Sequence, residues 1–171
     1  MLDCVFSTPR FYLRENKISD ARDMYLLNAD PEMLKFTGDV PFRDEQEAKY
    51  FIINYKHFYK HGFGRWVIVD KNNNEFLGWC GLKRHADGMV DLGYRIKKEH
   101  WGKGIATECA KACIHYGFDQ LNLTEIVGRS AKANFASINI LEKVGIRFWK
   151  ADTCDGIADA VWYRIDRFTL L

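Results

Sequence analysis

A glycine-rich turn, Trp101-Gly102-Lys103-Gly104-Ile105-Ala106, stands where a predicted strand gives way to a predicted helix. Glycines let the backbone turn tightly, and the first amides of a helix have no partner within it. The helix dipole favours negative charge at that end, and Lys103 adds a mobile cation. The turn therefore predicts a pyrophosphate site. The alternative is a helix start that uses glycine only for its geometry.

Two other phosphate-binding patterns do not fit this turn. A Walker A loop would need a glycine where Lys97 stands, and a Ser or Thr after Lys103, where Gly104 stands. The dinucleotide fingerprint would need a third glycine at Thr107, and it normally belongs to the first strand–helix unit of a domain. A nucleotide-binding protein that uses the same turn remains an alternative.

Strands and helices alternate so that the turn would lie beside a sheet. Apolar alternation predicts a strand over 90–96, an amphipathic helix follows over 104–118, and a short strand over 125–129 completes a parallel crossover unit. The other predicted elements are strands over 10–14, 66–69, 76–82, 147–154 and 158–168, and helices capped by Ser19, over 44–61 and over 134–144. An Asp155-Gly156 turn should join the last two strands. The order β α α β β β α β α β β indicates an α/β or α+β fold.

Composition and charge exclude several classes of protein. The 171 residues carry a net charge of +2, with 25 basic residues scattered among 23 acidic ones, which argues against a nucleic-acid-binding face but allows a local basic pocket. No apolar run approaches the ~20 residues of a membrane span, and no secretory leader is recognisable. The five cysteines lack the spacing of a disulfide framework or a metal site, so we expect free thiols in a cytoplasmic protein.

The glycine-rich turn resembles the acetyl-CoA loop of the GNAT superfamily, Gln/Arg-x-x-Gly-x-Gly/Ala. Gly104 and Ala106 match this pattern, and Trp101 replaces the usual Gln or Arg. The resemblance extends over nearly the whole chain. Its opening strand over 8–14 and the phrase WGKGIATE are similar to the branch that includes the ribosomal-protein N-terminal acetyltransferases.

A second segment carries the same resemblance. Asn134-x-x-Ser137 and the run over 141–148 are similar to the family's N-x-x-[AS]…EK-x-GF helix. In the family, a Tyr often stands where this chain has Leu141, so the chain departs from the pattern there. Asn134 would cap its own helix, contact the cofactor, or do both.

The resemblance implies one GNAT-type domain over 1–171, with a core over 8–168. It implies a mixed, mostly antiparallel seven-stranded sheet with helices on both faces. The fourth strand, 90–96, and the fifth, 125–129, would splay apart and admit the pantetheine arm of acetyl-CoA. The residues implied to contact this co-substrate are Leu92, Tyr94, Arg95, Ile96, Trp101, Gly102, Lys103, Gly104, Ile105, Ala106, Thr107, Asn134 and Ser137.

By the same resemblance the enzyme is an N-acetyltransferase whose acceptor amine attacks the thioester directly. The amine arrives protonated, so a group must remove its proton. Asp91 is the first candidate and Glu99 the second, although either carboxylate could simply be solvated at the surface. Ser137, or Tyr163 on the last strand, would protonate the leaving thiolate; a small packing residue and a core aromatic are the alternatives.

The branch implies a protein or peptide N-terminal α-amine as the acceptor. It would bind among the first two helices, their connection over 37–42 and the C-terminal hairpin. One alternative is a small amine such as an antibiotic, polyamine or amino acid. Another is a non-catalytic acyl-CoA sensor, suggested by Leu141 and the lack of an obvious base. We expect no metal, no nucleic-acid or membrane partner, and a monomer or homodimer.

Overall fold

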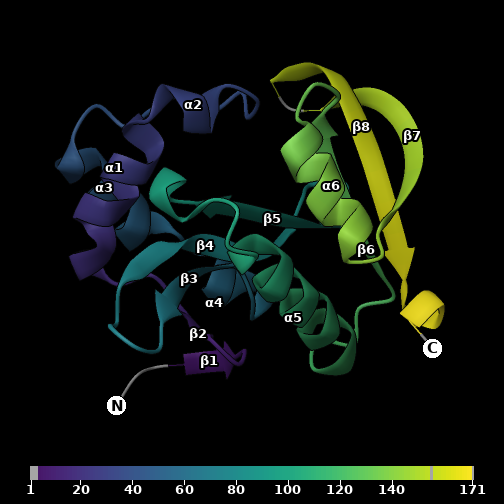
Figure 1. The fold of residues 1–171 in the computed structure, drawn as a ribbon, viewed down its shortest axis with the longest axis horizontal. Coiled ribbons are helices and arrows are strands. Elements are labelled where there is room, and N and C mark those ends of the chain that lie inside the picture. The colour runs from purple at the N-terminus through teal and green to yellow at the C-terminus, as the bar shows by residue number, and fades with distance from the viewer. Residues whose placement is uncertain (1–3, 155, 171) are drawn as a thin grey trace.

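The strands of the computed structural model, which describes residues 4–154 and 156–170, form one sheet (Figure 1). Within these residues the strand order is β1-β2-β3-β4-β5-β6-β8-β7, and β5 and β6 are the parallel neighbours in an otherwise antiparallel sheet. The mixed, mostly antiparallel sheet and its parallel crossover are therefore confirmed. The strands are β1 (Cys4–Ser7), β2 (Phe11–Arg14), β3 (Arg65–Asp70), β4 (Phe76–Arg84), β5 (Val90–Ile96), β6 (Glu125–Ala131), β7 (Arg147–Cys154) and β8 (Ile157–Asp166).

Helices cover both faces of this sheet, as the sequence predicts. They are α1 (Ala21–Ala29), α2 (Pro31–Leu34), α3 (Glu45–Asn54), α4 (His57–His61), α5 (Ile105–Asp119) and α6 (Phe135–Lys143). The helices α5 and α6 share a buried cluster with Leu92 and Ile126, whereas α1 and α3 share one with Val67 and Val69. In Figure 1, α5 and α6 lie toward the viewer, and α1 and α3 gather at the left.

The expected number of seven strands is wrong, because the described residues form eight. The additional strand, β1, has four residues and is too short to carry a periodic signal. A tight turn brings it back beside β2, since the Thr8 amide donates to the Phe11 carbonyl at 2.9 Å and Thr8 Oγ1 accepts from the Phe11 amide at 3.0 Å. The ring of Phe6 then stacks on Tyr116 of α5, with centroids 4.6 Å apart, so β1 adds to the core.

The single helix expected over 44–61 is two helices, α3 and α4. They are separated by Tyr55, whose φ and ψ of −73° and 86° are not helical. The phenolic oxygen of Tyr55 accepts a hydrogen bond from the Arg65 amide at 3.0 Å, so the chain leaves the helix where this side chain is seated against β3. The apolar periodicity continues across the break and could not reveal it.

The start of α1 is organised by Asp20 rather than by the expected cap Ser19. The Asp20 carboxylate accepts from the Lys17 amide at 2.7 Å, and it accepts two bonds from the Arg14 guanidinium at 2.7 and 2.8 Å. Both charged side chains are buried. The expected cap is therefore wrong by one residue: Asp20 is the N-cap of α1, and its carboxylate is held in a buried, bidentate ion pair with β2.

The parallel strands β5 and β6 separate after a short contact. Among the described residues they pair at Asp91–Val127 and at Leu92–Gly128, although each strand has seven residues. Beyond Leu92 the two strands diverge, so the backbone edge of β5 that carries Tyr94 is left unpaired on that side. The hairpin of β7 and β8 closes between Cys154 and Ile157, as expected for a tight turn, and Asp155 lies outside the described residues.

Gly128 holds β6 close to α6, and its replacement by alanine should destabilise the fold by about 1–3 kcal/mol. A Cβ at this position would lie 2.5 Å from Cδ2 of Leu141, whose side chain is 1% exposed. Urea denaturation measures the change in unfolding free energy. Leu141→Ala alone should cost about 2–5 kcal/mol, and the double variant should cost less than the sum, because the new methyl fills part of the cavity. Additive losses would contradict this account of the contact.

The described residues contain neither a helix long and apolar enough to span a membrane nor a group of three or more potential metal ligands. The cysteines, all of which lie within 4–154, are free thiols. Cys80 and Cys113 approach closely, with 3.6 Å between their sulfur atoms, and both are buried. They pack in the core between β4 and α5, as expected of small apolar residues.

Candidate active site

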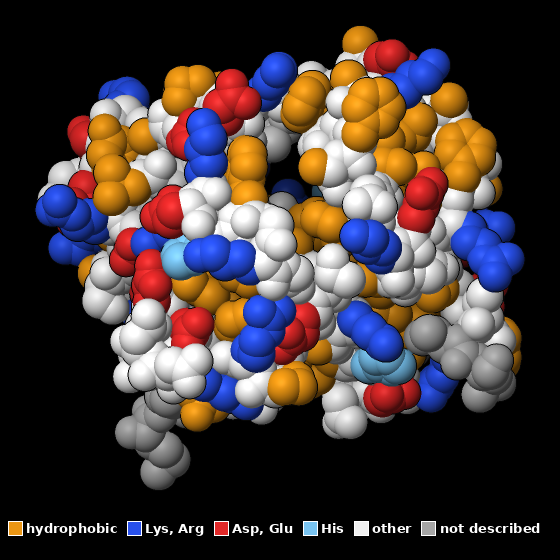
Figure 2. Space-filling model, viewed as in Figure 1, with side chains coloured by type: hydrophobic (Ala, Val, Ile, Leu, Met, Phe, Trp, Pro, Cys, Tyr) orange, Lys and Arg blue, Asp and Glu red, His pale blue; other side chains and the backbone are white. Residues whose placement is uncertain are grey.

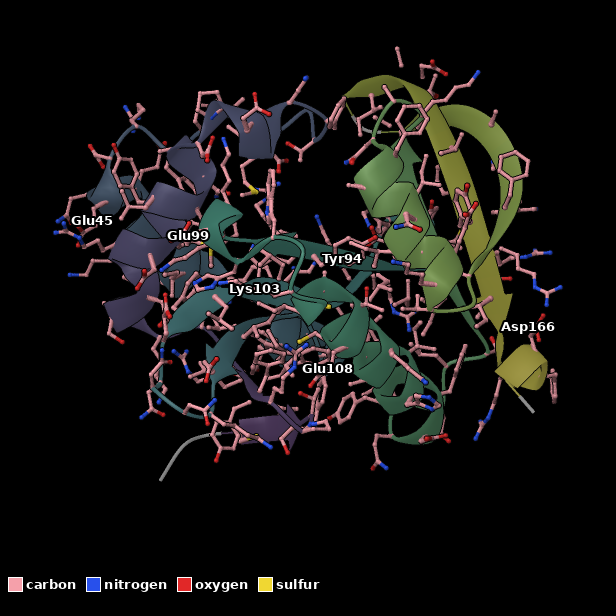
Figure 3. All side chains as sticks on the ribbon, viewed as in Figure 1. Glu45, Tyr94, Glu99, Lys103, Glu108 and Asp166 are labelled. Carbon is pink, nitrogen blue, oxygen red and sulfur yellow. The ribbon has the colours of Figure 1, made fainter. Side chains whose placement is uncertain are left out.

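The glycine-rich turn leaves the first turn of α5 open. Gly102 and Gly104 have left-handed φ angles of 75° and 73°, and no side chain among the described residues caps the helix. A Cβ at Gly102 would meet no described atom within 4 Å, and one at Gly104 would meet Arg10 Nη2 at 3.6 Å. The first amides of α5 thus lie at a helix end that has no described side-chain cap and little crowding around its glycines, as an anion site requires. Figure 3 shows Lys103 of this turn near the start of α5.

Two side chains fasten the turn to the sheet and to the helix. Trp101 Nε1 donates to the Ile96 carbonyl at 2.8 Å, which ties the turn back to the end of β5. Arg10 Nε donates to Glu108 Oε2 at 2.7 Å, and Arg10 Nη1 donates to the Lys103 carbonyl at 3.1 Å. The guanidinium of Arg10 is half exposed beside Gly104, so it is a further candidate to contact phosphate.

Arg10 is not among the site residues predicted from the sequence. This residue precedes β2, almost a hundred positions before the turn, and no local pattern relates the two. Only the packing of the β2 end against α5 brings them together. Ile105, expected among the cofactor contacts, is buried, so its amide rather than its side chain can serve the site.

On the other side of the split, Asn134 caps α6. Its Oδ1 accepts from the Ser137 amide at 3.2 Å, so the capping role expected of Asn134 is present. Tyr94 reaches across the gap, because its hydroxyl donates to the Ser137 carbonyl at 2.8 Å and lies 3.2 Å from Ser137 Oγ. Burial raises the pKa of the Tyr94 phenol, which therefore keeps its proton. Figure 3 shows Tyr94 between α5 and α6.

The α5–α6 side of the molecule is hollowed at this split. Figure 2 shows a deep opening between the part that contains α1 to α3 and the part that contains α6 and β8. The outer rim is bridged by backbone contact, because a Cβ at Gly38 would lie 3.0 Å from the Gly156 carbonyl oxygen.

Residues 10–147 match the family model described as the acetyltransferase (GNAT) domain. The uncharacterized N-acetyltransferase p20 of Bacillus licheniformis is 32% identical over 143 residues, which cover 82% of this chain and 80% of p20. The chain belongs to the GNAT acetyltransferase family. It is thus an acyltransferase that uses acetyl-CoA, and the open helix end and the split sheet of this GNAT enzyme fit a long, anionic co-substrate.

Solved structures share the GNAT fold at lower identity. A GNAT acetyltransferase from Bacillus anthracis has a TM-score of 0.81 and 20% identity, with 94% of this chain and 96% of that chain covered. Spermidine N-acetyltransferase from Vibrio cholerae, in complex with CoA and spermine, has a TM-score of 0.78 and 21% identity, with 94% of this chain and 98% of that chain covered. Ribosomal-protein-S5-alanine acetyltransferase from Vibrio fischeri has a TM-score of 0.74 and 21% identity, with 94% of this chain and 95% of that chain covered.

Asp91 lies on the face of β5 away from the glycine-rich turn, in a buried charge cluster. Its Oδ1 accepts from Arg65 Nη2 at 2.9 Å and lies 2.9 Å from His85 Nε2. Burial alone would raise the pKa of Asp91. The Arg65 guanidinium, the hydrogen bond from His85 and the charge of Arg129 lower it by more, so the pKa falls below its ordinary value to about 2. A carboxylate with so low a pKa is a weak base, and its role as proton acceptor stays a prediction.

The low pKa of Asp91 should make the GNAT enzyme lose stability between about pH 4 and pH 2. A depressed pKa favours the fold above the unfolded value of 3.8, and this contribution is lost as the pH falls through the folded value. A shift of this size corresponds to about 2 kcal/mol. Urea denaturation across this range should show a steeper loss for the natural chain than for Asp91→Asn. Equal slopes would contradict the assignment.

Glu99, the second candidate for the base, lies in the short 3-10 turn over 98–100 that follows β5. The two candidates for the proton donor, Ser137 and Tyr163, lie on the α6 side of the sheet. Ser137 Oγ is beside Tyr94, within the gap that the cofactor is expected to enter. The hydroxyl of Tyr163 donates to Glu142 Oε1 at 3.2 Å, and burial raises the pKa of this phenol, as does the neighbouring carboxylate. Leu141, which stands where the family often has Tyr, is buried against Gly128 and is part of the core.

On the face of the sheet that carries Asp91, the strands form the floor of a cavity of about 340 Å³. Its floor includes Trp79, whose ring lies between two guanidinium groups, those of Arg65 at 5.3 Å and Arg95 at 5.4 Å. Arg95 was expected among the cofactor contacts, but its side chain bonds to Asn28 and Asp39 in this cavity, so only its backbone faces the split. The sequence analysis also missed the role of Arg65 in the cavity.

Proposed function

We propose that this enzyme acetylates the primary amine of a small molecule by direct attack. The two substrates would approach the split of β5 and β6 from opposite faces. Acetyl-CoA would lie on the α5–α6 face, with its pyrophosphate at the glycine-rich turn. The acceptor would occupy the 340 Å³ cavity, a volume within the usual range for small-molecule sites. The observation that carries the proposal is the pairing of β5 and β6 at so few positions, which leaves the edge of β5 beyond Leu92 unpaired on the side of β6, where the thioester and the amine would meet.

The residues of the turn and of α6 would hold the co-substrate. The amides from Gly104 to Thr107, with Lys103 and Arg10, would bind the phosphates, and the exposed edge of β5 would pair with the pantetheine arm. Asn134 and Ser137 would contact that arm from α6. Acetyl-CoA supplies an activated acyl group, and holding it in line with the amine lowers the entropic part of the barrier.

Proton transfer would involve both faces. We keep Asp91 as a candidate on the acceptor face, where its carboxylate, bound to Arg65 and His85, would stabilise the incoming ammonium more readily than it would take its proton. Ser137 would donate a proton toward the leaving sulfur, supported by the Tyr94 hydroxyl at 3.2 Å. Tyr163 is the weaker candidate, because its hydroxyl already donates to Glu142.

A peptide or protein N-terminal α-amine is the second candidate acceptor. A larger cavity of about 670 Å³ lies between α3, α4 and the loop over 40–42. It shares Val40, Phe42, Phe51 and Tyr55 with the 340 Å³ cavity, so it could hold the residues that follow a terminal amine. The solved structures point both ways, since one acts on spermidine and another on a ribosomal protein by their names. A domain over 1–171, a cytoplasmic location, a monomer or homodimer, and no nucleic-acid or membrane partner remain predictions.

Two measurements test this function. The temperature of thermal unfolding should rise with CoA and acetyl-CoA and stay unchanged with ATP or NAD. Release of CoA thiol should then be followed with a panel of small amines and of peptides with free N-termini. Turnover of small amines above that of peptides would support the proposal, and the reverse would favour the second candidate. Stabilisation by CoA with no thiol release from any acceptor would contradict the proposal and favour an acyl-CoA sensor.

A further inference from the structure

The wall of the 340 Å³ cavity is unusually cationic for a site that receives an amine. Its charged lining consists of Arg65, Lys83, Arg95 and one carboxylate, Asp39. The chain as a whole has nearly equal numbers of basic and acidic residues, so this excess is local. A positively charged acceptor would enter such a cavity against repulsion unless it also carried negative charge.

Strand register explains how these cations share one surface. In the antiparallel pair of β4 and β5, Trp79 is opposite Arg95, Gly81 is opposite Gly93, and Lys83 is opposite Asp91. The glycine pair leaves the sheet bare, and the Arg65 guanidinium lies in this space, since a Cβ at Gly93 would meet it at 2.7 Å. The cavity floor therefore presents, along a few residues, a guanidinium on each side of Trp79 and a lysine beyond.

These cations differ in how well they are neutralised. Arg65 is bound to Asp91, a partner that lies beneath it in the sheet. Arg95, 8% exposed, is bound to Asp39, whose side chain is 56% exposed on the rim loop. Lys83 is exposed and has no hydrogen-bond partner among residues 4–154 and 156–170. A ligand anion can thus reach two of the three cations. It can bind Lys83 directly, and it can bind Arg95 by displacing Asp39.

Asp39 indicates the chemistry that such an anion would have. Its Oδ2 accepts from Arg95 Nη2 at 2.6 Å, so a carboxylate already occupies the mouth of the cavity. The rest of the wall is largely apolar, with Met24, Val40, Phe42 and Phe51 above the sheet. A ligand that combines a carboxylate with an apolar body would meet both kinds of surface.

We infer that the acceptor is an amino-acid-like compound, in which a free carboxylate lies close to the primary amine. Its carboxylate would bind Arg95 and Lys83, and its amine would be turned toward the split of β5 and β6. This inference rests on the proposed function. In the transfer the amine nitrogen bonds to the acetyl carbon as the carbon–sulfur bond breaks. The ammonium loses two protons, one of which ends on the CoA sulfur and the other in solvent.

Acceptors that differ only in the carboxylate provide the test. The standard amino acids and their carboxamides are compared by CoA thiol release, with spermidine and free-N-terminal peptides alongside. The free acids should have kcat/KM at least about tenfold above that of their amides, the effect of a lost charge-assisted bond. Arg95→Gln should raise KM for the free acids by a similar factor while leaving KM for the amides unchanged, and Arg95→Lys should restore part of the preference.

Control variants keep the test decisive. Arg22→Gln removes an exposed guanidinium of α1 outside the cavity and should leave the preference for the free acid unchanged. Lys83→Met should weaken that preference without affecting the fold, which covers the case in which Arg95 variants do not fold. Equal or better turnover of the amides, of spermidine or of peptides would overturn the inference while leaving the acetyltransferase intact. Equal effects of Arg95→Gln on acids and amides would also overturn it, whereas no turnover of any acceptor would overturn the proposed function as well.

Discussion

Replacing Gly104 by glutamate should abolish the stabilisation of this enzyme by CoA. The substitution places a carboxylate at the amino end of α5, where the phosphates are expected, and it forces a side chain onto a residue with a φ of 73°. At a CoA concentration of about a hundred times its Kd, the natural chain should gain about 2.7 kcal/mol. For a domain of this size, that gain corresponds to a rise of roughly 5 to 10 °C in Tm.

Gly88→Glu is the matched control for this experiment. Gly88 has a similar φ of 85° and, like Gly102, open space at its Cβ, but it lies in the turn between β4 and β5. Both variants should lose similar stability without ligand, because both carry the same backbone strain and the same added charge. Only the Gly104 variant should lose its thermal response to CoA. An unchanged response in that variant would overturn the location of the cofactor site.

Replacing Arg65 by methionine should lower the unfolding free energy by about 3–5 kcal/mol. The substitution leaves the buried Asp91 carboxylate with His85 as its described hydrogen-bond partner and with the more distant charge of Arg129, and it removes the bond of 2.6 Å from Arg65 Nη1 to the Gly81 carbonyl. The carboxylate would then be poorly compensated in a site where its side chain is 11% exposed. Urea denaturation at neutral pH measures the loss.

Two further variants show whether the loss comes from the unpaired charge. Arg65→Met combined with Asp91→Leu removes both charges and should recover most of the stability. Arg43→Met breaks the exposed pair with Glu47 and should cost no more than about 0.5 kcal/mol. A double variant as unstable as the sum of the two single ones would contradict the charge explanation.

Local signals in the sequence were enough to predict much of the fold. The strands over 90–96 and 147–154 have the predicted bounds, because alternation and neighbouring turns mark both ends. The glycine-rich turn and the helix after it were also predicted, since Gly104 and the amphipathic pattern are neighbours in the chain. These features need no knowledge of what packs against them.

The features that sequence analysis missed depend on contacts between distant segments. Arg10 meets Glu108, Arg65 meets Asp91, and Arg95 meets Asp39 only because the sheet and its helices bring them together. A charged residue in a strand looks solvated until its partner is known. The charged part of the 340 Å³ cavity consists largely of such pairs, so its chemistry became visible only in three dimensions.

The narrow seam between β5 and β6 also bears on the mechanics of the enzyme. The two parts of the sheet pair at two described positions there, and α5 connects them along the chain, so a further separation would break few backbone hydrogen bonds of the sheet. A thioester arm lying in the gap would pair with the edge of β5 and contact the part of the molecule that contains β6 and α6. The enzyme would then be stiffest when loaded, and departure of the product would coincide with its loosest state.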